Sequence, residues 1–126
     1  MLRPLALLMC VCASLVAPGA ARADAPHSLC GMSFHSRSEL QKKLRAENAR
    51  LFAGDGVTSA LTNSASDLTL WWLTGPKSRA YPAIACVQKK ATAGQGFELK
   101  PAEAYCGGAS SPECNRLRRA IHRAKF

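Results

Sequence analysis

Four cysteines that follow an N-terminal leader constrain the fold of this chain more than any other feature. Cys30, Cys86, Cys106 and Cys114 lie beyond residues 1–23, which have the features of a cleavable signal peptide. That segment has a positive charge near its start, an apolar centre at 5–16 and the small-x-small sequence Ala-Arg-Ala at 21–23. Export would place the mature chain in an oxidising compartment, where cysteines pair into disulfides. We therefore expect a periplasmic or secreted protein whose fold is built around two disulfides.

The mature segment 24–126 has room for one small domain and not for two. It contains no apolar run of the length that crosses a bilayer, so the sequence predicts no membrane span.

Four cysteines permit three pairings. Cys106 and Cys114 are close in sequence and flank a glycine turn, which favours a bridge between them and leaves Cys30 to pair with Cys86. The proximity of Cys30 and His35 leaves metal binding as an alternative. There is no C-x-x-C pair, however, and His27, His35 and His122 show no shared ligand spacing. We therefore expect structural disulfides, with no metal and no cofactor.

Two amphipathic segments enclose the middle of the chain. The first has a capping box, Ser36 to Glu39, and then leucines at helical spacing, which predicts a helix over 37–53 ended by Gly54. The second begins at Ser110 or Ser111 and carries an apolar stripe that starts at Cys114. The polar segment 24–33 is expected to be a loosely ordered arm.

Between the helices the period changes to that of a strand. We expect strands at 57–61, 68–74, 82–89 and 97–100, joined by short turns. Such short connections favour antiparallel pairing. The predicted fold class is α+β, with an N-terminal helix, a three- to four-stranded antiparallel sheet and a C-terminal basic helix, both helices packing on one face of the sheet.

Two adjacent tryptophans on the strand at 68–74 must point to opposite faces of the sheet. Trp72 shares a face with Leu68 and Leu70 and is the better core candidate. Trp71 is then a candidate surface anchor for a partner or a sugar. The alternative is that Trp71 lies under a helix while Trp72 packs at an edge.

The C-terminal helix is strongly basic. The chain has 17 basic and 8 acidic residues, and removal of Arg3 and Arg22 with the leader leaves 15 against 8, a net charge of +7. Four arginines with no acid after Glu113 are candidate anion-binding residues: Arg116, Arg118, Arg119 and Arg123. The alternative is a solvated helix face whose charge maintains solubility.

Catalytic patterns are missing from the sequence. The acidic residues occur singly, no serine lies in a G-x-S-x-G elbow, and every mature cysteine is expected in a bridge. We therefore expect a non-catalytic binding module of the bacterial envelope, such as an inhibitor, immunity protein or accessory subunit. The expected partner is an envelope or secreted protein with an acidic surface. The alternative is a basic protein that binds an anionic envelope polymer, phospholipid, lipopolysaccharide or nucleic acid.

Overall fold

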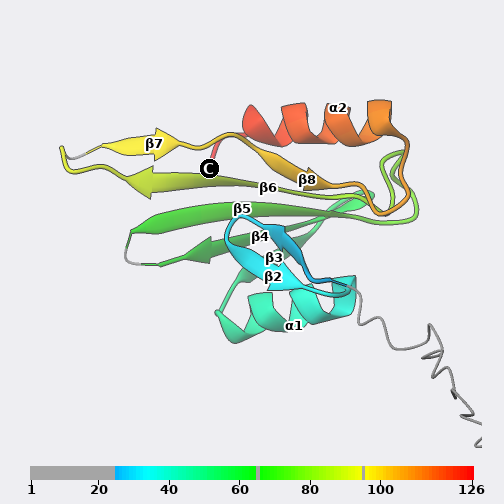
Figure 1. Ribbon diagram of the computed structural model, residues 1–126, viewed down its shortest axis with the longest axis horizontal. Coiled ribbons are helices and arrows are strands. Elements are labelled where there is room, and N and C mark those ends of the chain that lie inside the picture. Colours follow the sequence, from blue (N-terminus) through cyan, green and yellow to red (C-terminus); the bar gives the residue numbers. More distant parts are fainter. Residues whose placement is uncertain (1–24, 65, 95) are drawn as a thin grey trace, which may run out of the picture.

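The structure is a computed structural model that describes residues 25–64, 66–94 and 96–126, so the predicted signal peptide lies outside the described residues. Within the described residues, two helices and eight strands follow one another (Figure 1). Their bounds are β1 His27–Leu29, β2 Met32–Phe34, α1 Arg37–Ala46, β3 Arg50–Ala53, β4 Val57–Asn63, β5 Asp67–Thr74, β6 Ile84–Ala91, β7 Phe97–Leu99, β8 Glu103–Tyr105 and α2 Ser111–His122.

The main sheet is antiparallel and has six strands in the described part of the chain. Its order is β3-β4-β5-β6-β7, and β8 pairs with the start of β6, whereas β7 pairs with the end of β6. The mixed α and β content and the antiparallel pairing agree with the prediction, but the expected three or four strands were too few. β3 was missed because its residues also fit a helical period and were assigned to the first helix, and β8 was missed because it has only three residues and starts shortly after Pro101.

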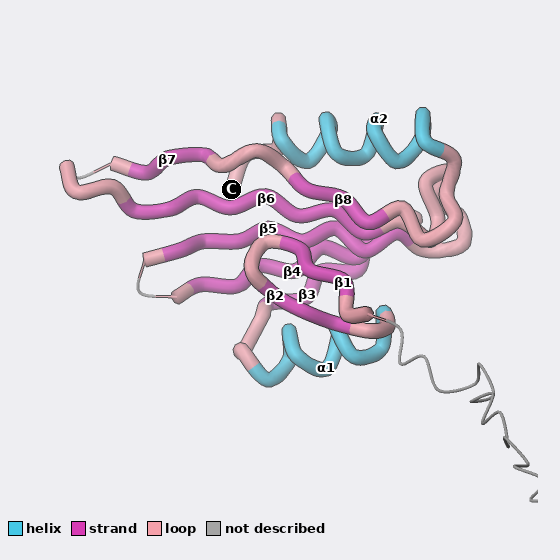
Figure 2. Tube along the Cα trace, viewed as in Figure 1, coloured by secondary structure: helices cyan, strands magenta, loops and turns pink. Residues whose placement is uncertain are grey.

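The two helices cover opposite faces of this sheet, and the prediction that they share one face was wrong. Figures 1 and 2 show α1 and the β1–β2 hairpin on one side of the central strands and α2 on the other. The cause is the alternation along β5, where Trp71 and Leu73 join the core under α1, whereas Leu70 joins the core under α2. A strand that is apolar on both faces needs a covering layer on each.

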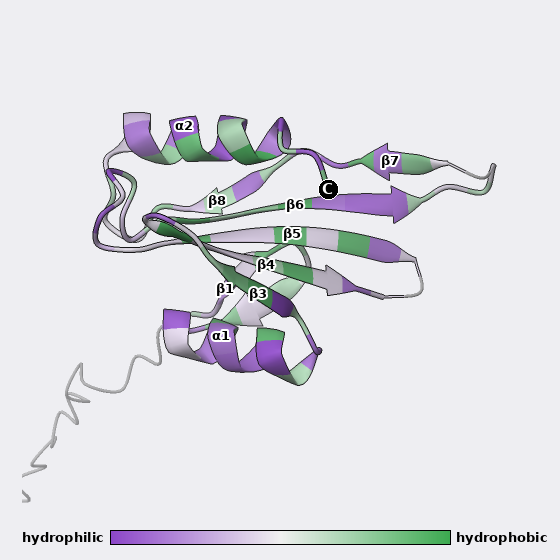
Figure 3. Ribbon diagram, turned by 180° about the vertical axis from the view of Figure 1, so that it is seen from behind, coloured by the Kyte–Doolittle hydropathy of each residue, from purple (hydrophilic) through white to green (hydrophobic). Residues whose placement is uncertain are grey.

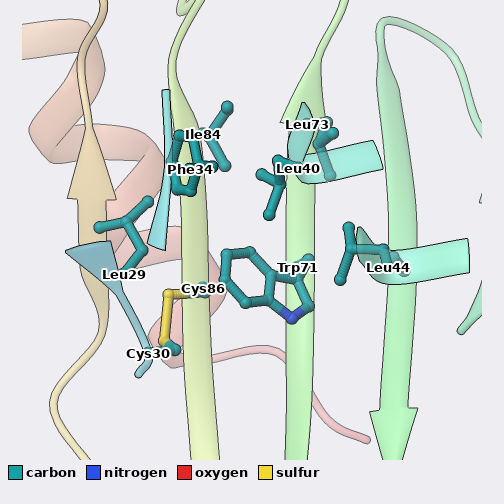
Figure 4. Close-up of a cluster of buried hydrophobic side chains, with 10 residues drawn as sticks. Leu29, Cys30, Phe34, Leu40, Leu44, Trp71, Leu73, Ile84 and Cys86 are labelled. Carbon is teal, nitrogen blue, oxygen red and sulfur yellow. A yellow bond between two sulfur atoms is a disulfide. The ribbon is translucent and has the colours of Figure 1, made fainter. Parts of the chain in front are cut away.

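The core under α1 is built around Trp71, which is 1% exposed. Leu40 and Leu44 of α1, Phe34 of the hairpin and Cys86 of β6 surround the indole ring (Figure 4). The indole Nε1 is buried and has no hydrogen-bond partner among the described residues.

Helix α1 begins as predicted and ends earlier. The Ser36 hydroxyl accepts a hydrogen bond from the backbone N–H of Glu39, at 3.2 Å, and the Glu39 carboxylate accepts one from the backbone N–H of His35, at 3.1 Å. This bond from His35, with Lys43 nearby, holds the pKa of the Glu39 carboxyl below its ordinary value.

The predicted continuation of α1 to residue 53 is wrong because Asn48 adopts a left-handed conformation, with φ of 57°. The backbone N–H of Asn48 donates to the Arg45 carbonyl and that of Ala49 to the Leu44 carbonyl, which is the Schellman arrangement. The chain then turns back into β3, so Leu51 and Phe52 belong to an edge strand and are exposed.

The expected loose arm at 24–33 is instead mostly a hairpin. β1 and β2 pair antiparallel around a tight turn in which Cys30 and Gly31 have positive φ, 48° and 78°. The backbone N–H of Cys30 donates to the Glu103 carboxylate at 2.8 Å, and its carbonyl accepts from Gln88 at 3.0 Å. Polar contacts to the main sheet therefore fix the hairpin turn.

Both predicted disulfides are confirmed. Cys30 is bonded to Cys86, 56 residues away, and Cys106 to Cys114, 8 residues away. The first joins the hairpin to the centre of the sheet, and the second joins the end of β8 to the first turns of α2.

The two bridges are expected to differ in their contribution to stability. In the chain-entropy model the Cys30–Cys86 bridge contributes about 4.2 kcal/mol and the Cys106–Cys114 bridge about 2.6 kcal/mol, because the first closes the longer loop. Urea unfolding of the double-alanine variants of each pair should therefore show a larger loss of unfolding free energy without Cys30–Cys86. Equal losses, or the reverse order, would contradict this account.

Candidate functional site

Helix α2 is held by a cap at its start and by an apolar stripe along one side. The Ser110 hydroxyl accepts from the backbone N–H of Glu113, and Pro112 lies in the first turn, where its missing N–H has no cost. Cys114, Leu117 and Ile121 are buried against the sheet. Figure 3 shows the opposite character of the two sides of α2, green toward the sheet and purple toward solvent.

All four arginines predicted from the sequence line one open groove of about 830 Å³ beside α2. Pro101 and Ala102, in the connection that leads into β8, form its other wall, and His122 completes it. We call this feature the basic groove; it is lined by Pro101, Ala102, Arg116, Arg118, Arg119, His122 and Arg123.

Most of the positive charge in the basic groove is not neutralised. Arg116 forms an ion pair with Glu113 at 3.1 Å, and Arg123 Nε donates to the Arg119 carbonyl at 3.3 Å. The guanidinium groups of Arg118 and Arg119 contact no carboxylate and make no hydrogen bond within residues 25–64, 66–94 and 96–126. Guanidinium groups bind carboxylates and phosphates through paired N–H donors, so the groove is suited to an anionic group.

Part of this positive charge also has a role in the helix itself. Arg119 lies in the last turn of α2, where cations interact favourably with the negative end of the helix dipole. Arg116 and Arg118 precede that turn, so this stabilisation does not explain the whole cluster.

The structure overturns the prediction of Trp71 as a surface anchor. Its side chain is buried under α1, whereas Trp72 is only partly buried, in the core under α2. The prediction failed because it placed both helices on one face, which left the other face of β5 without a cover. Pro101 and Ala102 were also missed as groove residues, since the sequence shows only that Pro101 interrupts a strand.

Cys30, Cys86 and Glu103 bring three possible metal-ligand atoms within 4.8 Å of one another. Both sulfur atoms are in the disulfide, and the Glu103 carboxylate accepts the Cys30 backbone N–H. Metal binding by cysteine requires thiolates, so this cluster is part of the hairpin attachment while the bridge is intact.

Comparison of the chain with protein-family models, curated proteins and solved structures gives no match. Neither α1 nor α2, the helices of the described segments, has the length and apolar character required to cross a membrane. The chemistry of the basic groove is therefore the guide to function.

The different burial of the two tryptophans is measurable by fluorescence. The Trp72→Phe variant reports on Trp71 alone and should emit at shorter wavelength, with acrylamide quenching several-fold weaker than in Trp71→Phe, because Trp71 is 1% exposed. Equal quenching of the two variants would contradict the burial of Trp71. Circular dichroism of both variants serves as the control for folding.

Proposed function

We propose that the protein is an exported, non-catalytic binding module whose basic groove contacts an acidic surface of an envelope or secreted protein. The observation that carries this proposal is the convergence of four arginines on one groove, with no carboxylate against Arg118 or Arg119 among the described residues. An inhibitor, immunity protein or accessory subunit acts through such contacts.

The rigidity of the groove supports a role in recognition. A disulfide ties the first turns of α2 to the end of β8, and the apolar stripe of α2 packs on the sheet. Side chains on a fixed helix lose little backbone entropy when they bind a partner. The arginines therefore lie on a preorganised scaffold.

The composition of the groove favours a protein over a simple polyanion. Pro101 and Ala102 provide an apolar wall next to the guanidinium groups. Binding hot spots in protein interfaces are enriched in arginine and lie where water is excluded. A folded partner can cover this wall while its carboxylates reach the arginines.

The net charge supports the alternative of an anionic envelope polymer. Basic residues outside the groove, including Lys42 and Arg45 on α1, would add to the attraction of phospholipid, lipopolysaccharide or nucleic acid. Such binding depends on total charge more than on one groove and weakens steeply as salt rises.

The paired disulfides agree with the setting proposed from the leader. Disulfides persist in oxidising compartments such as the periplasm and the extracellular medium. We accordingly place the proposed contact outside the cytosol.

Charge reversal in the groove is expected to weaken partner binding strongly. The acidic partner is first captured from periplasmic or secreted extract. The Arg118→Glu/Arg119→Glu variant should raise its dissociation constant at least about thirtyfold, because loss of an arginine hot spot costs ~2 kcal/mol or more. Calorimetry with the purified partner measures this change.

The matched control reverses the same charge on the other side of the sheet. Lys42→Glu/Arg45→Glu alters two exposed α1 residues and should leave protein binding nearly unchanged. If both variants weaken binding equally and moderate salt removes it, the polymer alternative is correct. If neither changes binding, the basic groove is not the contact surface.

A further inference from the structure

A second cavity lies on the α1 face of the sheet, opposite the basic groove, and has a volume of about 430 Å³. The hairpin turn at Cys30 and Gly31, the end of α1 and the connection between β4 and β5 surround it. The polar residues that matter for its chemistry are Glu47, Thr62, Asn63, Asp67, Thr69 and Gln88. We call it the hairpin cavity.

The floor of the hairpin cavity is a polar row across three strands. Thr62 of β4 pairs with Thr69 of β5, which pairs with Gln88 of β6. The next row on the same face is Ala60, Trp71 and Cys86, which belongs to the apolar core. Along each of these strands, the face under α1 thus changes from apolar to polar within two residues. The hairpin turn lies over the place where this change occurs.

Hydrogen bonds fix part of this row. Gln88 Nε2 donates to the Cys30 carbonyl at 3.0 Å and to the Thr69 hydroxyl at 3.1 Å. Both amide donors of Gln88 are therefore used, and its carbonyl oxygen makes no bond to the described chain. The Thr69 hydroxyl still has its proton to donate.

Thr62 is the group that this arrangement leaves without a partner. Its side chain lines the cavity, the residue is only 9% exposed, and no described residue accepts from or donates to its hydroxyl. The hydroxyl itself is reached by solvent, because Trp71 Nε1 is the one fully buried side-chain polar atom without a partner in the described residues. A ligand in the cavity can therefore replace solvent as the hydrogen-bond partner of Thr62.

The charge of the lining excludes anions. Glu47 and Asp67 contribute carboxylates, and no lysine or arginine lines the cavity, although the full chain has a net charge of +9. Lys90 lies opposite Asp67 in the strand register without forming an ion pair with it. Hydroxyl, amide and carboxylate groups together form hydrogen bonds with a ligand that has several hydroxyls.

We propose that the hairpin cavity binds a small uncharged polyhydroxylated ligand, a sugar or sugar alcohol. The ligand donates hydroxyl protons to the Asp67 and Glu47 carboxylates and to the Gln88 carbonyl oxygen. It also forms hydrogen bonds with the Thr62 and Thr69 hydroxyls. The volume falls in the range of small-molecule sites, about 300–1,000 Å³. This inference does not depend on the basic groove, which lies on the other face of the sheet.

Titration of the oxidised, 15N-labelled protein tests the proposal, with glucose and mannitol as neutral probes and gluconate as the anionic probe. Glucose or mannitol should produce saturable shifts at the backbone amides of Gly31, Thr62 and Thr69 and at the Gln88 side-chain amide. Gluconate should bind several-fold more weakly because it approaches two carboxylates, and the variant Asp67→Asn should reduce that difference. Gluconate binding as tightly as glucose, or an absence of saturable shifts with both neutral probes, overturns the proposal.

Two threonine variants on one strand separate ligand binding from structure. Thr62→Val keeps the shape of the side chain and should weaken binding of the neutral probe about tenfold, because one hydrogen bond is lost. Thr58→Val makes the same change on the same strand outside the cavity and should leave binding unchanged. Equal binding by the two variants would show that solvent fills a cavity with no ligand function. Thermal unfolding of both variants verifies that each is folded.

Discussion

The covalent attachment of the hairpin to the sheet is the constraint on which the α1 side of the molecule depends. Cys86 lies in the middle of β6 beside Trp71, and its bridge holds Cys30 over the sheet. Glu103 and Gln88 bind the backbone of the same turn from two further positions. The three attachments hold the turn above the polar row of the sheet. The apolar core therefore ends, and the hairpin cavity begins, between two neighbouring rows of side chains on the same sheet face.

The two faces of the central strands differ in chemistry as well as in cover. Toward α2 the sheet is apolar, and the charge lies on the outer side of that helix, where the basic groove is open to solvent. Toward α1 the polar groups lie on the sheet itself, in a cavity that the hairpin turn partly covers. Alternation along β5 and β6 allows one pair of strands to support both arrangements, because neighbouring side chains belong to opposite faces. An open cationic groove is compatible with a large partner, and a smaller cavity lined by hydroxyl, amide and carboxylate groups is compatible with a small uncharged molecule.

Local signals in the sequence predicted much of this fold. The caps at Ser36 and Ser110, the disulfide pairing and the central strands each follow from nearby residues, and the four arginines were identified because they occur on one short helix. The sequence did not predict features that depend on how segments far apart in the chain pack against one another. The end of α1 depends on Asn48 in a conformation that few residues adopt, while Leu51 and Phe52 fit a helical period equally well. The burial of Trp71 depends on which face each helix covers, and the hairpin cavity depends on a register that joins residues from three strands.

The indole nitrogen of Trp71 shows which part of this side chain stabilises the fold. Its N–H lies in the apolar core with no acceptor among the described residues, so the polar atom is a net cost and the ring alone stabilises the fold. The position thus requires a large apolar side chain rather than a donor. Phenylalanine would keep a flat ring in this core without burying an unpaired polar atom.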